Sequence, residues 1–493
     1  MARAIMLMGT GSDVGKSLIA AGLCRAFTLR GLKVRPFKPQ NMSNNAAVTA
    51  DGGEIGRAQA LQARAANVAP SVHMNPLLLK PETSTGAQVI VRGKRVASMG
   101  ARAFFADRRQ FMPAILDSFR RLAADVDLVI VEGAGSPAEV NLRDGDLANM
   151  GFAEAANIPA ILIGDIHRGG VIASLIGTWA VIPEADGARL KAFIINNFHG
   201  DVTLFSEGRA FAEEHLGRPC LGIVPHFAGA AALPAEDALG LEKAGSQNGA
   251  SKIAVLRLPR IANFDDIDPL RLEPGVTVAM ITSGKPIPGD ARLVIIPGSK
   301  STISDLAALR GEGWDIDLAA HVRRGGQVLG LCGGYQILGR KVHDPQGLEG
   351  PAGSMDGLAL LDVETTLLAG KTLTEVDAIH CASGAQVTGY EIHLGATAGN
   401  DGTRPFAMIN GKPDGAMSRD GRIMGTYLHG LFSGDKFRSA FLASLGAAQS
   451  GLHFEDTIET TLNALAAHLE THLDLDAILA LAGKVDDFGL SPS

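Results

Sequence analysis

The chain has 493 residues, 46% of them hydrophobic, and a formal net charge of −7. This length exceeds what a single hydrophobic core usually organises, so it predicts two or three domains. The acidic balance, without a basic cluster, argues against a nucleic-acid surface, and no apolar run approaches the ~18 residues that cross a bilayer. The four widely spaced cysteines argue against a disulfide framework and favour a reducing, cytoplasmic location. We expect no signal peptide, because a predicted strand begins almost at the first residue.

The first predicted strand, residues 4–8, runs into a glycine-rich stretch, and helical apolar spacing follows over residues 18–29. A glycine-rich turn between a strand and a helix directs backbone N–H groups and the positive end of the helix dipole at one point, which suits phosphate. The alternative is a plain glycine-rich turn, since five residues rather than the standard four separate Gly9 from Gly15. We favour nucleotide binding, in which a lysine contributes positive charge and a serine hydroxyl suits Mg²⁺. The predicted binding residues are Thr10, Gly11, Ser12, Asp13, Val14, Gly15, Lys16 and Ser17, of which Ser17 is the predicted metal ligand.

A polar loop follows the second predicted strand, residues 32–38, and is too rich in hydrogen-bonding groups for a core. One interpretation is a solvated loop. The other is a surface that binds a large polar ligand, because amide side chains both donate and accept hydrogen bonds. The residues that would bind such a ligand are Gln40, Asn41, Ser43, Asn44 and Asn45.

Two later strands end in side chains that suit a nucleotide site. Residues 126–131 form an apolar run that leads to Glu132, whose carboxylate suits Mg²⁺ at the sheet edge where ligands bind, although a turn cap is the alternative. The strand predicted over residues 190–198 contains Asn196, which either contacts an adenine edge or shapes a turn. Strands alternate with helices throughout residues 1–230, and this alternation predicts a doubly wound parallel sheet.

A change in composition predicts a linker over residues 231–250, and a second series of strands then defines a domain over residues 251–440. In this domain an apolar strand runs into Cys332, which is followed by glycines and a helical pattern, as in a nucleophile elbow with cysteine as the nucleophile. The helix N-terminus would favour the thiolate, and the N–H groups of Gly333 and of the Gly298 loop are candidate donors to an oxyanion. The alternative is that Cys332 is simply a small buried hydrophobic residue.

A cysteine nucleophile needs a base, and His429 lies just past a short predicted strand. Alone it would more often be structural, but together with the elbow it predicts a Cys332–His429 catalytic pair. The last segment, residues 441–493, has apolar residues at helical spacing, and we expect its helices to pack on the preceding domain.

Four segments of the first half together resemble the cobyric acid synthases, the glutamine-dependent amidases of cobalamin biosynthesis. They are residues 9–17, 36–45, 54–59 and 74–81. The phosphate loop alone would fit a wider group that includes dethiobiotin synthetase and cobyrinate a,c-diamide synthase, in which the longer glycine spacing is usual. The block from Gln40 to Asn45 favours the cobyric acid synthases, whereas His167 departs from their pattern, which has an acidic residue there.

The second half resembles the class I glutamine amidotransferases, in the branch shared by the two cobyrinic-acid amidases. Most members of class I carry Glu two residues after the catalytic histidine, but this chain has Leu431 there, so another group must orient His429. Glu391 and His393 belong to a further segment that matches the cobyric acid synthases, and their roles are unassigned.

The resemblance implies a P-loop ATPase-like domain followed by a class I glutamine amidotransferase-like domain, both of α/β class. It implies that ATP and Mg²⁺ are required and that glutamine hydrolysis at Cys332 supplies ammonia. The ammonia would amidate the b, d, e and g carboxylates of adenosylcobyrinic acid a,c-diamide to give adenosylcobyric acid. The partners would be the corrinoid, glutamine and ATP, with no nucleic acid or membrane, and the oligomeric state is not predicted. The alternatives are cobyrinic acid a,c-diamide synthase and, more remotely, a P-loop switch ATPase.

Overall fold

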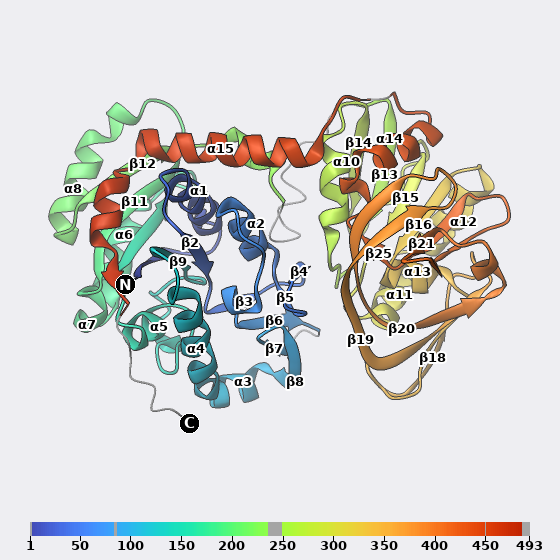
Figure 1. The fold of residues 1–493 in the computed structure, drawn as a ribbon, viewed down its shortest axis with the longest axis horizontal. Helices are drawn as coiled ribbons and strands as arrows, with labels where there is room; N and C mark the ends of the chain where they lie inside the picture. Colours follow the sequence, from blue (N-terminus) through green and yellow to red (C-terminus); the bar gives the residue numbers. More distant parts are fainter. Residues whose placement is uncertain (1, 83–85, 235–248, 449, 486–493) are drawn as a thin grey trace. The chain divides into compact units, whose positions relative to one another are not determined.

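The computed structural model describes residues 2–82, 86–234, 249–448 and 450–485. The chain divides into two compact units (Figure 1). Unit 1 contains Met1–Ser43, Thr49–Leu233 and Ile458–Ser493, and unit 2 contains Asn44–Val48 and Pro234–Thr457. Most of the predicted linker, residues 235–248, lies outside the described residues.

Unit 1 is built around a parallel sheet with the strand order β12-β11-β10-β1-β9-β2. Its strands are β1 (Arg3–Gly9), β2 (Val34–Phe37), β9 (Leu128–Glu132), β10 (Ala160–Asp165), β11 (Leu190–Phe198) and β12 (Cys220–Pro225). The central strand β1 pairs in parallel with β9 on one side and with β10 on the other. Its residues 4–8 are fully buried, as in parallel sheets that are covered on both faces, which explains the unbroken apolar run in the sequence. The predicted α/β class with parallel sheets is confirmed.

Helices follow the strands of this sheet along the chain. They include α1 (Lys16–Leu29), α2 (Arg57–Ala65), α4 (Met112–Ala123), α5 (Met150–Ala155), α6 (Val171–Val181) and α8 (Ser206–Leu216). Phe119 of α4 and Phe152 of α5 each pack on Phe37 of β2, with ring centroids 5.3 Å apart. Because the strands are parallel, their carboxyl ends meet at one edge, which carries the phosphate loop, Glu132 and Asn196.

A smaller sheet of unit 1, with the order β3-β6-β7-β8, contains part of the amide-rich loop. Its strands are β3 (Gln40–Met42), β6 (Leu77–Pro81), β7 (Gly86–Val91) and β8 (Lys94–Gly100). Strand β3 pairs in parallel with β6, so Gln40 to Met42 are fixed by a backbone ladder rather than forming an open loop.

Unit 2 contains a second mainly parallel sheet, with the order β14-β13-β15-β16-β24-β23. Its strands are β13 (Ser251–Leu256), β14 (Val276–Ile281), β15 (Leu293–Ile296), β16 (Gln327–Leu331), β23 (Ala416–Met417) and β24 (Ile423–Thr426). Strand β16 leads directly into α13 (Gly333–Leu338), and Cys332 lies at the junction.

A mostly antiparallel sheet of unit 2, with the order β18-β17-β19-β20-β25, carries His429, the predicted catalytic base. Its strands are β17 (Lys341–Asp344), β18 (Gly353–Asp356), β19 (Val363–His380), β20 (Gln386–Gly399) and β25 (Leu428–His429). In its register Tyr390 of β20 lies opposite His429 of β25.

The end of the chain packs differently from our expectation that residues 441–493 cover the preceding domain. The elements concerned are α14 (Asp435–Ser444), α15 (Phe454–His472), α16 (Leu475–Leu481) and β26 (Gly483–Lys484). Helix α14 belongs to unit 2, but from Ile458 onward the chain belongs to unit 1. Leu469 of α15 lies so close to α1 that a Cβ on Gly22 would approach its Cδ1 to 2.4 Å, and β26 pairs antiparallel with β1. Apolar spacing predicts that a helix face is buried, but it does not indicate which element covers that face.

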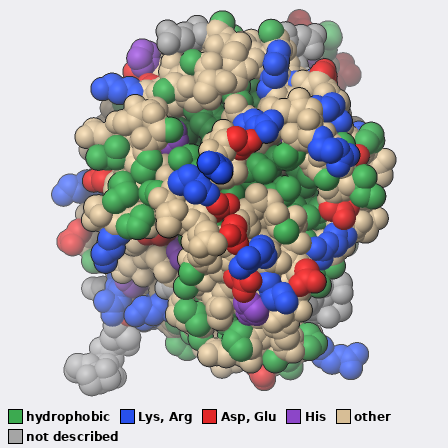
Figure 2. All heavy atoms as spheres, turned by 90° about the vertical axis from the view of Figure 1, so that its right-hand side faces the viewer, with side chains coloured by type: hydrophobic (Ala, Val, Ile, Leu, Met, Phe, Trp, Pro, Cys, Tyr) green, Lys and Arg blue, Asp and Glu red, His purple; other side chains and the backbone are tan. Residues whose placement is uncertain are grey.

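Within the described ranges, no helix has both the length and the apolar character needed to cross a membrane. On the face drawn in Figure 2, Lys and Arg side chains are interspersed with Asp and Glu rather than gathered in one area.

Candidate active site

The phosphate loop of unit 1 depends on a glycine at the start of α1. Gly15 has a φ of 91°, and a Cβ there would lie 2.2 Å from the Nδ2 atom of Asn196, so a side chain is excluded both by conformation and by space. Asn196 is buried, and its Nδ2 donates to the carbonyl of Val14 at 2.9 Å. Asn196 therefore holds the loop in place, while its contact with adenine stays a prediction.

Lys16 is held against the loop rather than extended into solvent. Its Nζ donates to the carbonyl of Gly11 at 2.8 Å and to that of Gly135 at 3.0 Å, and only 7% of the residue is exposed. The positive charge thus lies within the loop where phosphate oxygens would bind. Asp13, another loop residue, faces Arg168 with an N–O distance of 3.3 Å.

Glu132 lies at the centre of a buried polar cluster beside this loop. The residue is 1% exposed, and its carboxylate accepts hydrogen bonds from Ser17 Oγ at 2.7 Å, Lys38 Nζ at 2.8 Å and Gln62 Nε2 at 2.6 Å. The two predicted metal ligands, Ser17 and Glu132, therefore lie side by side, and the Lys38 ammonium offsets the charge of the carboxylate.

The pair of oxygens from Ser17 and Glu132 fits Mg²⁺, which is usually held by one or two side chains together with substrate phosphates and water. In the part of the chain that the structure describes, no group of three or more His, Cys, Asp or Glu side chains forms a metal site. Binding of Mg²⁺ by Ser17 and Glu132 remains a prediction.

The amide-rich segment is more deeply buried than a ligand-binding surface would be. Asn41 is 4% exposed, and its Nδ2 donates to Gln59 Oε1 at 2.9 Å, while Gln59 in turn donates to Glu132 at 3.4 Å. The segment is also divided between the units: Gln40, Asn41 and Ser43 belong to unit 1, and Asn44 and Asn45 belong to unit 2. The Oδ1 atom of Asn44 is buried without a hydrogen-bond partner among the described residues. The corrinoid contacts of this segment stay predictions.

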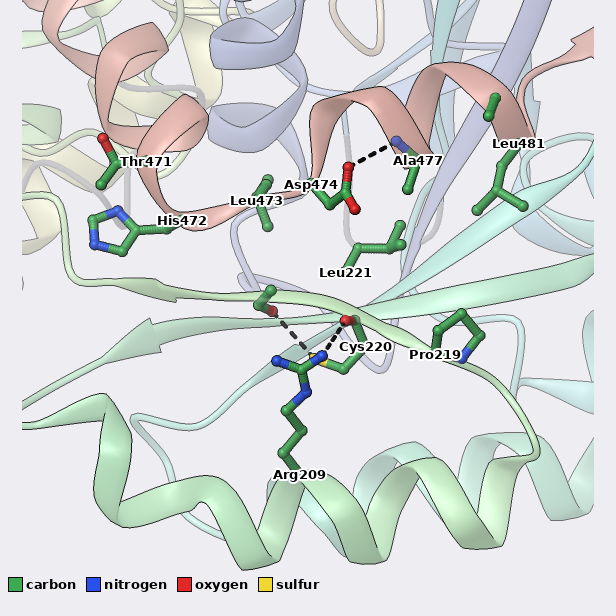
Figure 3. Close-up of a pocket in the computed structure, with 12 residues that line it drawn as sticks. Arg209, Pro219, Cys220, Leu221, Thr471, His472, Leu473, Asp474, Ala477 and Leu481 are labelled. Atoms are coloured by element: carbon green, nitrogen blue, oxygen red, sulfur yellow. Dashed lines mark hydrogen bonds between the residues drawn. The ribbon is translucent and has the colours of Figure 1, made fainter.

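A cavity of about 620 Å³ in unit 1 lies away from these groups, beside the beginning of β12 (Figure 3). Arg209 reaches from α8 to donate to the carbonyl of Cys220 at 3.0 Å, and Asp474 accepts from the N–H of Ala477 at 2.9 Å. None of the predicted site residues lines this cavity. Since Cys220 begins the strand, the cavity is far along the sheet from the carboxyl edge that carries the phosphate loop.

Cys332 has the strained backbone of a nucleophile elbow. Its φ is 51° and its ψ is −108°, a conformation that non-glycine residues rarely adopt. A Cβ on Gly334 would lie 1.9 Å from the carbonyl of Ile296, so the turn requires glycine two residues after the cysteine. The Sγ–H group points to the carbonyl of Ile392 at 3.5 Å.

The predicted catalytic base, His429, is completely buried and is oriented by Asp266. Nδ1 of His429 lies 2.7 Å from Oδ2 of Asp266, whose Oδ1 accepts from the N–H of Gly430 at 2.5 Å. The ring of Tyr390 stacks on the imidazole with a centroid distance of 5.2 Å. Leu431, at the usual position of the orienting Glu, is buried and apolar. Asp266 is thus the third member of a Cys-His-Asp arrangement, and sequence reasoning missed it.

The charge on His429 is set by its surroundings. Burial alone would lower the pKa of His429, but the negative charge of Asp266, the hydrogen bond to it and the nearby Cys332 thiol together raise this pKa to about 10. Burial also raises the pKa of Asp266. We place the shared proton on His429, because both carboxylate oxygens of Asp266 accept hydrogen bonds. The arrangement therefore favours an imidazolium at His429, beside the sulfur of Cys332.

The predicted oxyanion donors lie close to this pair. A Cβ on Gly298 would be 3.3 Å from Cε1 of His429, and a Cβ on Gly333 would be 2.9 Å from the backbone nitrogen of Ser299. The Gly298 loop is fixed by Asp305, which accepts from Ser299 Oγ at 2.7 Å. Gly298 and Gly333 thus meet at the nucleophile, and their roles as donors remain predictions.

Comparison with known proteins identifies the two domains. Residues 5–239 match the CobQ/CobB/MinD/ParA nucleotide binding domain, and residues 252–437 match the CobB/CobQ-like glutamine amidotransferase domain. Together with the phosphate loop and the Cys-His-Asp site, these matches define the class of the protein as a nucleotide-binding glutamine amidotransferase.

The particular family follows from full-length relatives. A cobyric acid synthase of Cereibacter sphaeroides is 61% identical over 479 residues, which are 97% of this chain and 99% of that protein. The cobyric acid synthases of Bradyrhizobium diazoefficiens and Jannaschia sp. are each 60% identical, over 98% and 97% of this chain and 100% and 99% of their own lengths. The chain belongs to the cobyric acid synthase family, and the predicted family and domain order are confirmed.

Proposed function

We propose that this chain is a cobyric acid synthase, which uses ATP and glutamine to amidate the b, d, e and g carboxylates of adenosylcobyrinic acid a,c-diamide. The observation that carries the proposal is the presence in one chain of a phosphate loop containing Lys16 and a buried Cys332–His429–Asp266 site. The first supplies a place for nucleotide phosphates, and the second supplies a thiolate that can split glutamine.

In the glutaminase step, the Cys332 thiolate attacks the side-chain amide carbon of glutamine. The N–H groups of Gly333 and Gly298 donate to the oxygen, which becomes negatively charged in the tetrahedral intermediate. His429 gives its Nε2 proton to the departing nitrogen, so ammonia leaves and a thioester to Cys332 remains. His429 then takes a proton from water, which attacks the thioester and releases glutamate. Asp266 keeps the imidazole oriented and stabilises its positive charge throughout.

In the synthetase step, a corrinoid carboxylate attacks the terminal phosphorus of ATP, so that an acyl phosphate and ADP form. Ammonia then attacks the acyl carbon, phosphate leaves, and the amide forms. Without ATP the carboxylate would have no good leaving group, so ammonia could not react with it. Lys16 offsets the charge of the phosphate oxygens, and the loop N–H groups around Gly15 bind them. Ser17 and Glu132 would hold Mg²⁺, which lowers the charge on the phosphates when bound. The residues from Gln40 to Asn45 would contact the corrinoid.

Two features support further details of the proposal. The four cysteines are unpaired, and Cys332 must stay reduced to act, so we place the enzyme in the cytoplasm. Asn196 would approach the base, since it lies on the loop side of β11. The partners would all be small molecules.

The test is to incubate the purified chain with ATP, Mg²⁺, glutamine and adenosylcobyrinic acid a,c-diamide, and to count added amides by mass. We expect four amides per corrinoid and one glutamate per amide. No change in corrinoid mass would refute the proposal. Amidation of cobyrinic acid only at the a and c positions would favour the diamide synthase instead.

A further inference from the structure

Strand β20 carries a histidine–carboxylate pair beside the nucleophile that the mechanism above does not use. Ile392, whose carbonyl accepts from the Cys332 thiol, is flanked in sequence by Glu391 and His393. The side chain of His393 is 10% exposed and that of Glu391 is 18% exposed, so both are largely removed from solvent. Burying polar side chains at this position is costly unless each one is hydrogen-bonded or paired.

The ring of His393 is fixed in place by an aromatic contact. It stacks on Tyr427 with a centroid distance of 3.8 Å and an interplanar angle of 17°. The Tyr427 hydroxyl accepts from Nε2 of Gln336 at 3.2 Å, and Gln336 lies on α13, the helix that follows Cys332. His393 is thus linked through Tyr427 and Gln336 to the helix that follows Cys332, and it is next in sequence to Ile392, whose carbonyl contacts the Cys332 sulfur.

One nitrogen of His393 has no partner. Nε2 lies 3.5 Å from Oε1 of Glu391, which favours the proton on Nε2 and leaves Nδ1 as an acceptor. Nδ1 is buried and makes no hydrogen bond to any residue that the structure describes. A buried acceptor without a donor is costly, so a bound ligand with an N–H group would satisfy it.

The charges around His393 are negative. Burial and the charge of Glu391 raise the pKa of Asp414 to about 6, although a hydrogen bond from Thr426 lowers it, so the two carboxylates affect each other. Neither Glu391 nor Asp414 pairs with a Lys or Arg side chain in the described part of the chain. The ligand group that suits this place is therefore a cation that donates hydrogen bonds.

We propose that His393 and Glu391 bind the α-ammonium group of the glutamine whose side-chain amide is attacked by Cys332. The inference rests on the proposed glutaminase function. The α-nitrogen of glutamine lies four bonds from the amide carbon, about 5 Å when extended, so one end can react at Cys332 while the other contacts His393. The pair then selects free glutamine against amides that lack the amino group.

The test compares glutamine with glutaramate, which is glutamine without its α-amino group. For His393→Ala and Glu391→Gln, we expect kcat/KM for glutamine to fall roughly 10- to 100-fold, as for loss of a hydrogen bond to a charged group, while kcat/KM for glutaramate changes less than about threefold. The matched control is His343→Ala. His343 also faces a glutamate in the same sheet, at 3.1 Å from Glu364, but β19 separates its strand, β17, from β20. We expect kcat/KM to be unchanged for both substrates.

A second measurement is the protection of Cys332 from alkylation by iodoacetamide. This measurement reports ligand binding and does not require the variant to be active. L-Glutamate should protect wild type but not His393→Ala, whereas glutarate, which lacks the amine, should protect both equally. Amidation driven by ammonium salts shows that each variant is folded.

The outcomes separate the two proposals. If wild type releases no ammonia from glutamine, the proposed function fails. If wild type releases ammonia, the α-ammonium assignment is tested by His393→Ala. The assignment is wrong if kcat/KM of this variant falls by the same factor for glutamine and for glutaramate, or if L-glutamate still protects its Cys332 from iodoacetamide.

Discussion

Replacing Asp266 with Asn removes the charge behind His429 while keeping the shape of the side chain. In the native site, Oδ1 of Asp266 accepts from the N–H of Gly430 and Oδ2 lies 2.7 Å from Nδ1 of His429. The amide of Asp266→Asn can still accept from Gly430, but it presents an NH₂ group to Nδ1. The imidazolium then loses its counter-charge and the ring loses the carboxylate that fixed its tautomer.

The size of the effect follows from the pKa of His429. Burial lowers this pKa, but Asp266 outweighs that effect and is the main reason why the pKa is raised to about 10. Without the carboxylate the pKa of His429 falls toward the ordinary histidine value of about 6.5. At that value only about 3% of the imidazole would be protonated at pH 8, a loss of about 30-fold in the reactive ion pair. Loss of orientation adds to this, since the same change in a serine triad costs about 10⁴ in kcat. We expect glutaminase kcat to fall between about 30-fold and 10⁴-fold.

The pH dependence of glutaminase activity should shift in a definite direction. Because the folded pKa of His429 is raised, the imidazolium and the stability it contributes are fully present below about pH 6.5 and are lost only as the pH rises through about 10. In Asp266→Asn, the decline in glutaminase activity should move down to near neutral pH. The assay is glutamate release from pH 6 to 10, with ammonia-driven amidation as the measure of folding.

The matched control is Asp265→Asn. The Asp265 carboxylate accepts from the Tyr390 hydroxyl at 2.9 Å, whereas the hydrogen bond to His429 comes from Asp266, so we expect a fall of less than about tenfold and no shift of the profile. The reasoning is refuted if Asp266→Asn keeps kcat within threefold of wild type, or if the two variants behave alike.

Three further predictions concern unit 1. Gly15→Ala should lower its stability by about 1–3 kcal/mol, measured by thermal unfolding, because the new Cβ meets Asn196 and φ is 91°; an unchanged Tm would contradict the geometry. Lys16→Met should weaken ATP binding at least tenfold by calorimetry, since the loop loses its positive charge, and a Kd within twofold of wild type would show that Lys16 does not contact phosphate. Ser17→Ala should raise the Mg²⁺ concentration for half-maximal amidation roughly tenfold, and an unaltered Mg²⁺ dependence would exclude Ser17 as a ligand.

The local features of both sites could be predicted from the sequence. The phosphate loop and the Cys332 elbow are short segments in which a strand, glycines and a helix follow one another, so their chemistry is visible in consecutive residues. Glu132 was predictable for the same reason, because it ends an apolar strand.

The residue that orients His429 could not be predicted, because Asp266 lies 163 residues away in the sequence. The absence of Glu at position 431 showed only that some other group was needed. Likewise, the spacing of residues 441–493 predicted buried helix faces but not their contact with α1 and β1. The amide block looked solvent-facing because its residues are polar, yet Asn41 is buried through its bond to Gln59, a partner outside the loop.

The central claim is that the two sites act as one enzyme, and tracing the nitrogen tests it most directly. Wild type and Cys332→Ala are each incubated with ATP, Mg²⁺, adenosylcobyrinic acid a,c-diamide, glutamine labelled with nitrogen-15 in its side-chain amide, and unlabelled ammonium. We predict that the amides added by wild type carry the label and that those added by Cys332→Ala carry none. Labelled amides from Cys332→Ala, or no amides from wild type, would contradict the account.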